Sequence, residues 1–258
     1  MARLVEGTAS DATVLERALV ELAQKTCTAP ARLTPADLEP VRAAAGDGAI
    51  DYALVMGSFH FINRIADLLH VDSEALPPVL RHVEPLRRLT VRIASKLLAR
   101  MDLSPRDYPH SFDDALRSAA LVFARALGRP LAGELSAAAA RPKAVELIAL
   151  ALEERDVRSS LDHGTLARVH DIVETAMPAG VADVEGLHAR PTDPVEALAF
   201  VGTRYAYRTT ATMIDALRRA GYDDLGILDL AIAVADANQW ARVYRLLGLP
   251  RALFSLGG

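Results

Sequence analysis

The fold is decided by residues 50–71, which read IDYALVMGSFHFINRIADLLHV. Apolar residues recur in this stretch at the spacing of one helix face, which predicts a long helix that packs in the interior. Polar side chains interrupt that face at Ser58, His60, Asn63 and Arg64. A buried helix with polar groups must supply each of them with a hydrogen-bond partner.

A second stretch of the same type lies near the C-terminus, where residues 228–249 read LDLAIAVADANQWARVYRLLGL. A spacing of 178 residues relates Asp51 to Asp229 and Arg64 to Arg242. Two further helical patterns precede each stretch, at 15–25 and 33–45 in the first case and at 195–204 and 209–221 in the second. A unit of three helices therefore recurs, which predicts an internal duplication.

Composition indicates an all-α protein. Of the 258 residues 51% are apolar and only 5% are aromatic, which suits close-packed helices better than sheets. A net charge of −4 argues against a nucleic-acid binder, since such proteins carry a basic excess.

The first residues lack an apolar signal core and no apolar run reaches about 18 residues, so we expect a cytoplasmic protein without a membrane span. Cys27 is the single cysteine, which excludes an internal disulfide.

Local signals place the helix boundaries and the domain limits. We expect an N-terminal helix that starts at Ser10 or Asp11 and ends before Ala29-Pro30, and a break at Gly46-Asp47-Gly48. A helix at 166–176 is expected to stop before Pro178. The predicted segments are an N-terminal helical half-repeat (1–80), a basic helix and connector (81–111) and a C-terminal domain (112–258).

The connector carries a basic stripe, because Arg88, Arg92, Lys96 and Arg100 recur every four residues beside an apolar stripe. Such a stripe fits an acidic partner or a membrane surface, and a solvated helix face is its commoner meaning. Helical periodicity resumes at 112–127 and at 143–153.

The order of residues 161–190 followed by the second repeat resembles the alkylhydroperoxidase D and carboxymuconolactone decarboxylase superfamily, here called AhpD-like. Members typically carry a Cys-x-x-Cys-x-x-x-His motif, and the corresponding register here is Val181 to His188. The histidine is present, whereas Val181 and Val184 replace both cysteines. The position of the family's proton-relay glutamate falls on Val169.

The resemblance implies an all-α, AhpD-like helical fold with an internal duplication, assembled as a homodimer or larger homo-oligomer. It also implies that thiol peroxidase activity is absent, because that chemistry requires one thiolate to attack the peroxide and a second thiol to form the disulfide. Valine does neither, and Cys27 lies outside the motif.

His188, His170 and Glu174 are the candidate catalytic residues. The decarboxylase branch of the family works without cysteine, so these three groups could exchange protons with a small carboxylic acid. An ordinary surface pair of His170 and Glu174, with a solvent-facing His188, explains the same residues. His163, His170 and Glu174 are a weak candidate for a metal site, because zinc ligands usually lie closer together in the sequence. We therefore expect neither a metal nor a cofactor.

A second polar set consists of His60, Asn63, Asn238 and Trp240, which we take as candidate ligand-binding residues. Arg64 and Arg242 have a structural interpretation, in which each binds helix carbonyls or one of the aspartates Asp51 and Asp229.

Three functional hypotheses remain. The first is an AhpD-like protein that lacks the cysteine pair and serves as a degenerate or pseudo-enzyme with a binding or structural role. The second is a cysteine-independent decarboxylase or isomerase that uses His188 on a small acid. The third is an all-α interaction module that docks through the basic stripe.

Overall fold

The computed structural model describes residues 12–69, 159–181 and 184–249 of the chain. In those residues all the regular elements are helical, so the all-α prediction is confirmed. The α-helices are α2 (Val14–Thr28), α3 (Glu39–Ala45), α4 (Ala49–Leu68), α9 (His163–Ala176), α10 (Pro194–Arg204), α11 (Ala211–Arg219) and α12 (Asp224–Leu247). The 3-10 helices are η2 (Pro30–Arg32), η3 (Pro35–Asp37), η4 (Gly46–Gly48), η6 (Val184–Ala189) and η7 (Ala206–Arg208). The predicted connector 81–111 and its basic stripe lie outside the described residues.

Side-chain caps fix where several helices begin. Thr13 caps α2 through a reciprocal pair of hydrogen bonds with Glu16, so the helix begins at Val14 and not at Ser10 or Asp11 as predicted. Three aspartates accept from the first backbone N–H groups of later helices: Asp162 for α9, Asp193 for α10 and Asp223 for α12.

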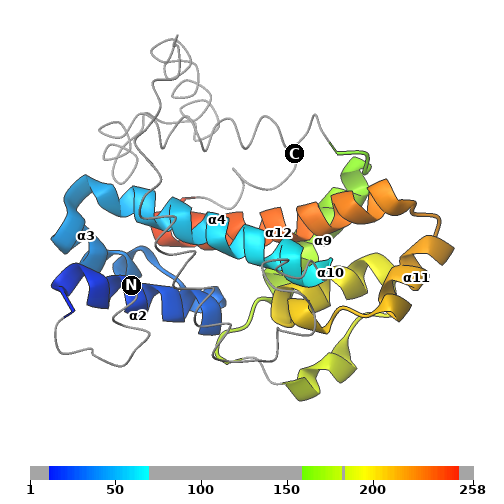
Figure 1. The fold of residues 1–258 in the computed structure, drawn as a ribbon, viewed down its shortest axis with the longest axis horizontal. Coiled ribbons are helices and arrows are strands. Elements are labelled where there is room, and N and C mark those ends of the chain that lie inside the picture. Colours follow the sequence, from blue (N-terminus) through cyan, green and yellow to red (C-terminus); the bar gives the residue numbers. More distant parts are fainter. Residues whose placement is uncertain (1–11, 70–158, 182–183, 250–258) are drawn as a thin grey trace, which may run out of the picture. The chain divides into compact units, whose positions relative to one another are not determined.

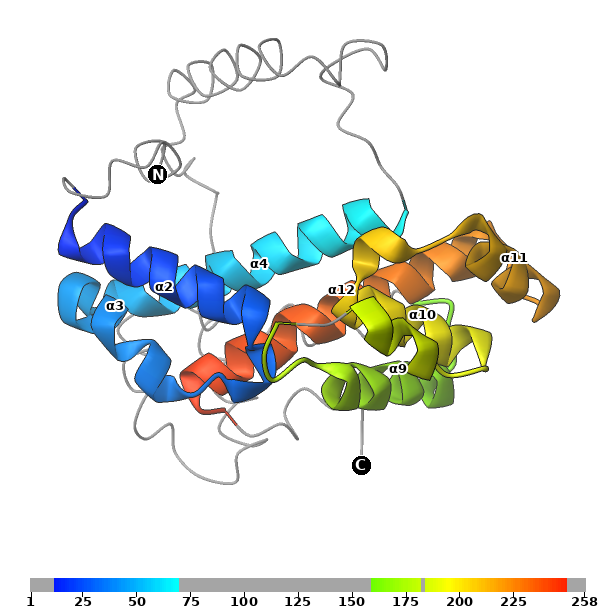
Figure 2. The same cartoon turned by 90° about the horizontal axis from the view of Figure 1, so that it is seen from below.

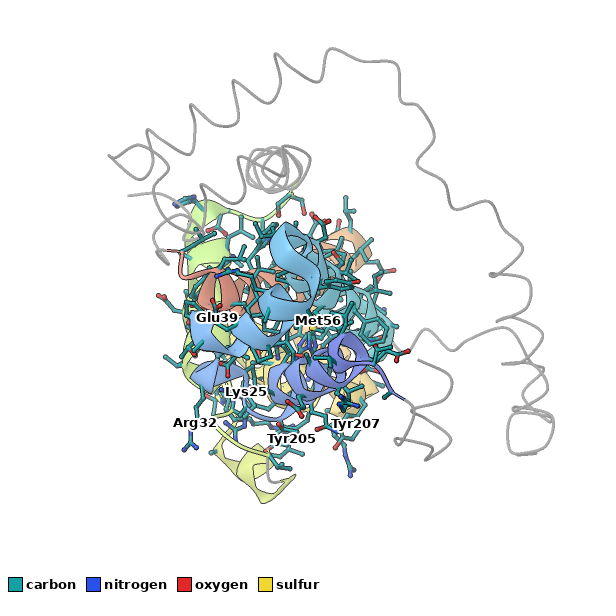
Figure 3. All side chains as sticks on the ribbon, turned by 90° about the vertical axis from the view of Figure 1, so that its left-hand side faces the viewer. Lys25, Arg32, Glu39, Met56, Tyr205 and Tyr207 are labelled. Atoms are coloured by element: carbon teal, nitrogen blue, oxygen red, sulfur yellow. The ribbon has the colours of Figure 1, made fainter. Side chains whose placement is uncertain are left out.

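The helix predicted over residues 33–45 is divided in the structure. Thr34 and Asp37 form a capping box around the short η3, and α3 then starts at Glu39 with Pro40 in its first turn. Lys25 of α2, labelled in Figure 3, forms an ion pair with Asp37 and so ties α2 to η3. The predicted break at residues 46–48 is confirmed, because η4 separates α3 from α4.

The two long helices α4 and α12 lie side by side (Figure 1). Helices α9 and α10 pack on α12 and on each other, while α2 packs on α3 and α4 (Figure 2). All of the described residues belong to one unit, composed of Met1–His70 and Asp113–Gly258. None of the described helices is both long and apolar enough to cross a membrane.

Glycines allow the closest helix approaches in this core. A Cβ atom at Gly57 of α4 would lie 2.6 Å from Val243 Cγ2 of α12 and 3.2 Å from Gln239 Cγ. At Gly202 of α10 it would lie 2.8 Å from Val234 Cγ1. Both positions therefore exclude a side chain where two helices meet, and they fix the separation of α4 and α10 from α12.

Gly57→Ala should lower the free energy of unfolding by up to about 2 kcal/mol. Overpacking costs about 1–3 kcal/mol, and the higher helix propensity of alanine returns roughly 1 kcal/mol. Urea denaturation measures the change. Gly180→Ala is the control, because a Cβ atom there meets nothing within 4 Å. Val243→Ala should recover part of the loss in the double variant, and an increased stability of Gly57→Ala would contradict the packing argument.

Candidate functional site

A buried polar network occupies the region where α4 and α12 meet the ends of α2 and α10. Arg64 of α4 donates from Nε to the carbonyl oxygen of Gly202 at 3.1 Å and from Nη2 to that of Thr203 at 2.9 Å. Arg242 of α12 donates from Nε to the carbonyl oxygen of Thr26 at 3.0 Å. These oxygens belong to the last turns of α10 and α2. The prediction that the arginines bind helix carbonyls is therefore confirmed.

The alternative prediction, in which Asp51 and Asp229 bind the two arginines, is wrong. Asp229 accepts hydrogen bonds from the backbone N–H and the hydroxyl group of Ser160, just before α9. Asp51 is exposed on α4. Each aspartate precedes its arginine by more than three helical turns, roughly 20 Å along the axis, whereas the ends of α2 and α10 lie against the guanidinium groups.

His60 and Asn238 make matching hydrogen bonds in the two halves of the network. His60 Nε2 lies 3.0 Å from the hydroxyl oxygen of Thr26, and its Nδ1 lies 3.4 Å from Arg64 Nη1. Asn238 Nδ2 donates to the hydroxyl oxygen of Thr203 at 3.0 Å, and its Oδ1 accepts from Arg242 at 3.1 Å. Each side chain thus links a threonine hydroxyl to an arginine.

These contacts fix the tautomer of His60. A guanidinium group only donates, so Nδ1 must accept from Arg64 and the ring proton must reside on Nε2. The Nε2–H group then donates to Thr26, whose hydroxyl donates to the carbonyl oxygen of Ala23 at 2.8 Å. His60 is therefore a neutral imidazole with both nitrogens engaged.

The electrostatics of the network keep His60 neutral. Burial, together with the positive charges of Arg242 and Arg64, lowers its pKa from 6.5 to about 2. Burial also lowers the pKa of Arg64 to about 10, so its guanidinium remains charged at neutral pH. Arg242 has its pKa lowered by burial and then by Arg64. The carbonyl oxygens at helix C-termini carry partial negative charge, which offsets these two cations.

The remaining candidate ligand-binding residues have separate environments. Trp240 is 1% exposed, and its Nε1 donates to Asp236 one turn earlier at 2.9 Å. Asn63 is exposed on α4, away from the buried network. Of the four candidates, the structure brings only His60 and Asn238 into one network, and both serve as links between helices.

Glu174 is held by two side chains of α12. Tyr244 donates its hydroxyl hydrogen to Oε1 of Glu174 at 2.6 Å, and Arg245 forms an ion pair with Oε2. The ion-paired side chains of Glu174 and Arg245 are only 12% and 17% exposed. Both carboxylate oxygens therefore bind α12 and join it to α9.

Of the other two predicted catalytic residues, the structure describes the side chain of His170 alone. His170 is half-buried one turn before Glu174 on α9, and it makes an interaction of its own. Val181 is 83% exposed. The side chains of Val184 and His188 lie outside the described residues, although η6 includes their backbone. Across residues 12–69, 159–181 and 184–249, no group of three or more His, Cys, Asp or Glu side chains is placed to hold a metal ion.

Sequence reasoning missed four residues that complete these contacts: Thr26, Thr203, Tyr244 and Arg245. The two threonines lie in the last turns of α2 and α10, and their hydroxyls bond backward to carbonyl oxygens of the same helix. The sequence signal that could have identified these threonines is their position just before a predicted helix end. Tyr244 and Arg245 contact a residue about 70 positions earlier in the chain, which local periodicity does not indicate.

Comparison of the chain with family models, with curated proteins and with solved structures finds no match.

Stability should depend on pH through His60. The folded-state pKa lies below the unfolded value, so the contribution is complete above about pH 6.5 and is lost as the pH falls toward 2. His60→Asn should remove this dependence, because asparagine makes the same links at position 238. Relative to the variant, the wild type should lose about 2 kcal/mol of unfolding free energy between pH 8 and pH 5.

Urea denaturation across this pH range measures the effect. Asn238→Ala is the control, since it should lower stability by a similar amount at every pH. Parallel pH profiles for the wild type and His60→Asn would show that His60 does not titrate differently on unfolding.

Glu174→Gln should lower the free energy of unfolding by about 1.5–3 kcal/mol, because it removes the charge that Arg245 binds in a mostly buried site. Thermal or chemical denaturation measures the loss. Glu21→Gln, on the exposed side of α2, should change stability by less than about 0.5 kcal/mol. A neutral effect of Glu174→Gln would indicate that the ion pair does not hold α9 to α12.

Proposed function

We propose that this chain is an AhpD-like helical protein that lacks the redox cysteine pair and functions by binding, as a degenerate or pseudo-enzyme without thiol peroxidase activity. The proposal starts from the register in which Val181 and Val184 replace the two cysteines of the family motif. Valine has no sulfur atom, so these two positions offer no nucleophile that could attack a peroxide. Cys27 is exposed on α2 and belongs to a different part of the chain.

The observation that carries the binding role is the engagement of Glu174. A general acid or base must be within reach of a substrate proton, and both oxygens of Glu174 already accept from Tyr244 and Arg245. His60, the other buried titratable candidate, has both ring nitrogens engaged and its pKa lowered to about 2. These two groups support a structural interpretation over proton transfer.

An internal duplication is part of the same proposal. Positions related by 178 residues have the same roles, since Arg64 and Arg242 both bind a helix end and His60 and Asn238 both link a threonine to an arginine. Shared hydrogen-bond roles at one constant spacing favour descent from a repeated unit.

Cytoplasmic location and homo-oligomeric assembly complete the proposal. The single cysteine is typical of a chain without structural disulfides and favours the first. The second follows from the resemblance, whose members assemble through helices of this type.

The experiment is peroxide consumption by the full chain with a dithiol reductant. Consumption should equal that of a Cys27→Ser variant and that of the buffer with the same dithiol, because a chain with a single cysteine contains no thiol pair of its own. Dithiol-dependent turnover by the wild type would overturn the proposal, whether or not Cys27→Ser abolishes it. Ellman titration of the single thiol, performed first, confirms that Cys27 is reduced at the start of the assay.

A further inference from the structure

One row of large apolar side chains on α4 is exposed among the described residues. Val55, Phe59 and Ile62 follow one another at spacings of four and three residues, and they are 64%, 63% and 63% exposed. Burying one such side chain stabilises a protein by about 1.5–3 kcal/mol. Three of them in one row are typical of a surface that packs against another segment.

The corresponding row of α12 is buried. Positions 178 residues later hold Ala233, Ala237 and Trp240, which are 7%, 3% and 1% exposed. Asp229 and Tyr244 extend this row by one helical turn at each end.

Helix α9 covers this row of α12, because its two ends contact the two ends of the row. Ser160, just before α9, donates its backbone N–H and its hydroxyl hydrogen to Asp229. Glu174, in the last turn of α9, accepts from Tyr244. The row that α9 covers on α12 is therefore the row that corresponds to Val55, Phe59 and Ile62 on α4.

The residues of α9 alternate between buried and exposed positions in a definite order. Buried positions in the helix and its C-cap are Thr165, Leu166, Val169, Val173, Ala176 and Met177. Exposed positions are His163, Gly164, Arg168, Asp171 and Thr175.

Residues 113–127 repeat this order at a constant spacing of 50 residues. All six positions that correspond to buried residues of α9 are apolar: Ala115, Leu116, Ala119, Phe123, Ala126 and Leu127. Four of the five that correspond to exposed residues are polar: Asp113, Asp114, Ser118 and Arg125. The sequence therefore predicts a helix of the α9 type over residues 113–127.

The other stretch of helical periodicity before α9, residues 143–153, does not repeat the order. The register that puts Ala144 and Val145 at the first two buried positions puts Arg155 and Asp156 at the last two. Charged residues are almost never fully buried without a partner. Residues 113–127 are therefore the better match to α9.

The differences between the two helix pairs compensate for one another in size. Helix α4 has Val55 and Phe59 where α12 has alanine, and residues 113–127 have Ala119 and Ala120 where α9 has Val169 and His170. Interiors are close-packed, so a larger residue on one helix requires a smaller one on its neighbour.

The polar contact between α9 and α12 is replaced on both sides at once. Tyr244 and Glu174, which bind each other, correspond to Ala66 and Ala124. A hydroxyl or a carboxylate left alone at a buried contact would cost about 1–3 kcal/mol, and this pair leaves neither.

The chain is long enough to bring residues 113–127 onto α4. Residues 70–112 join them to the end of α4, and residues 128–158 join them to the segment before α9. Helix α4 has 20 residues and is about 30 Å long, which either connection can span. The compact unit that contains α4 also includes Asp113–Gly258.

We propose that residues 113–127 of this chain dock as an amphipathic helix on Val55, Phe59 and Ile62 of α4, in the place that α9 has on α12. The inference rests on the internal duplication in the proposed function and extends the repeated unit from three helices to four. The fourth helix precedes the unit in the second copy and follows it in the first. The α4 row is then an internal interface of one chain.

The test measures how fast a thiol at position 62 reacts with maleimide in the full chain. Ile62→Cys in a Cys27→Ser background should react about tenfold or more slowly than Glu21→Cys in the same background, because a covered thiol reacts only when the covering helix opens. Glu21 is exposed on α2. Reaction of the two thiols at equal rates would show that the row is open and would overturn the proposal.

Two variants identify the segment that protects position 62. Phe123→Asp should restore fast labelling, since it puts a charge at the position of Val173, which is 0% exposed in α9. Ile148→Asp is the matched control in the other apolar stretch and should leave labelling slow. The reverse result would assign the row to residues 143–153, and protection that increases with protein concentration would assign it to a second copy. Either finding contradicts the proposal.

Crosslinking tests the same contact without disrupting it. Ala66→Cys and Ala124→Cys, combined in the Cys27→Ser background, should be joined within one chain by a short bismaleimide, whereas Ala66→Cys and Ala149→Cys should not. Mass spectrometry of the digested protein identifies the linked peptides. A missing link between positions 66 and 124 sinks the proposal even if Phe123→Asp fails to fold. Peroxide turnover would overturn the proposed function and leave the labelling and crosslinking results intact.

Discussion

The structure depends on two guanidinium groups that bind the ends of helices. Arg64 contacts carbonyl oxygens in the last turn of α10, and Arg242 contacts one in the last turn of α2. Those oxygens have no partner inside their own helix and carry the partial negative charge of its C-terminus. Each contact therefore gives a hydrogen-bond donor to a carbonyl oxygen at a helix end and an acceptor to a buried guanidinium group. Loss of either arginine would leave buried oxygens without donors, at a cost of about 1–3 kcal/mol each.

The same constraint explains why residue types that usually perform chemistry serve here as links. Each arginine needs an acceptor on its own helix, which His60 and Asn238 provide one turn earlier, and each of these then needs an acceptor for its own N–H group. Thr26 and Thr203 supply that acceptor and pass their hydroxyl hydrogens to carbonyl oxygens of α2 and α10. A chain of donors begins at each cation and ends in a helix backbone, which leaves the imidazole of His60 without a free nitrogen.

Local periodicity predicted the elements of this fold, and it could not predict their partners. Helical spacing identified α4 and α12, and the repeated arginines identified a structural role with helix carbonyls as one alternative. The choice between carbonyls and aspartates depended on which helix ends reach Arg64 and Arg242, a property of tertiary packing. Glu174 was interpreted through its neighbour His170, because the residues that hold it, Tyr244 and Arg245, come from a helix far along the chain. The starts of α4, α9 and α10 were predicted within about three residues, which is the uncertainty expected when several cap residues adjoin, whereas α3 begins at Glu39 because the capping box of Thr34 and Asp37 closes a separate short helix first.

The two long helices share their polar network and differ in the size of the residues on their outer faces, which determines what each can pack against. Ala233 and Ala237 of α12 are buried, and their short side chains allow a neighbouring helix to approach α12 closely. Val55, Phe59 and Ile62 project further from α4, so a helix on that face must lie at a larger separation or present small residues opposite Phe59. Arg64 and Arg242 bind the ends of α10 and α2, and the residues on the outer faces of α4 and α12 determine what each of these two helices can pack against.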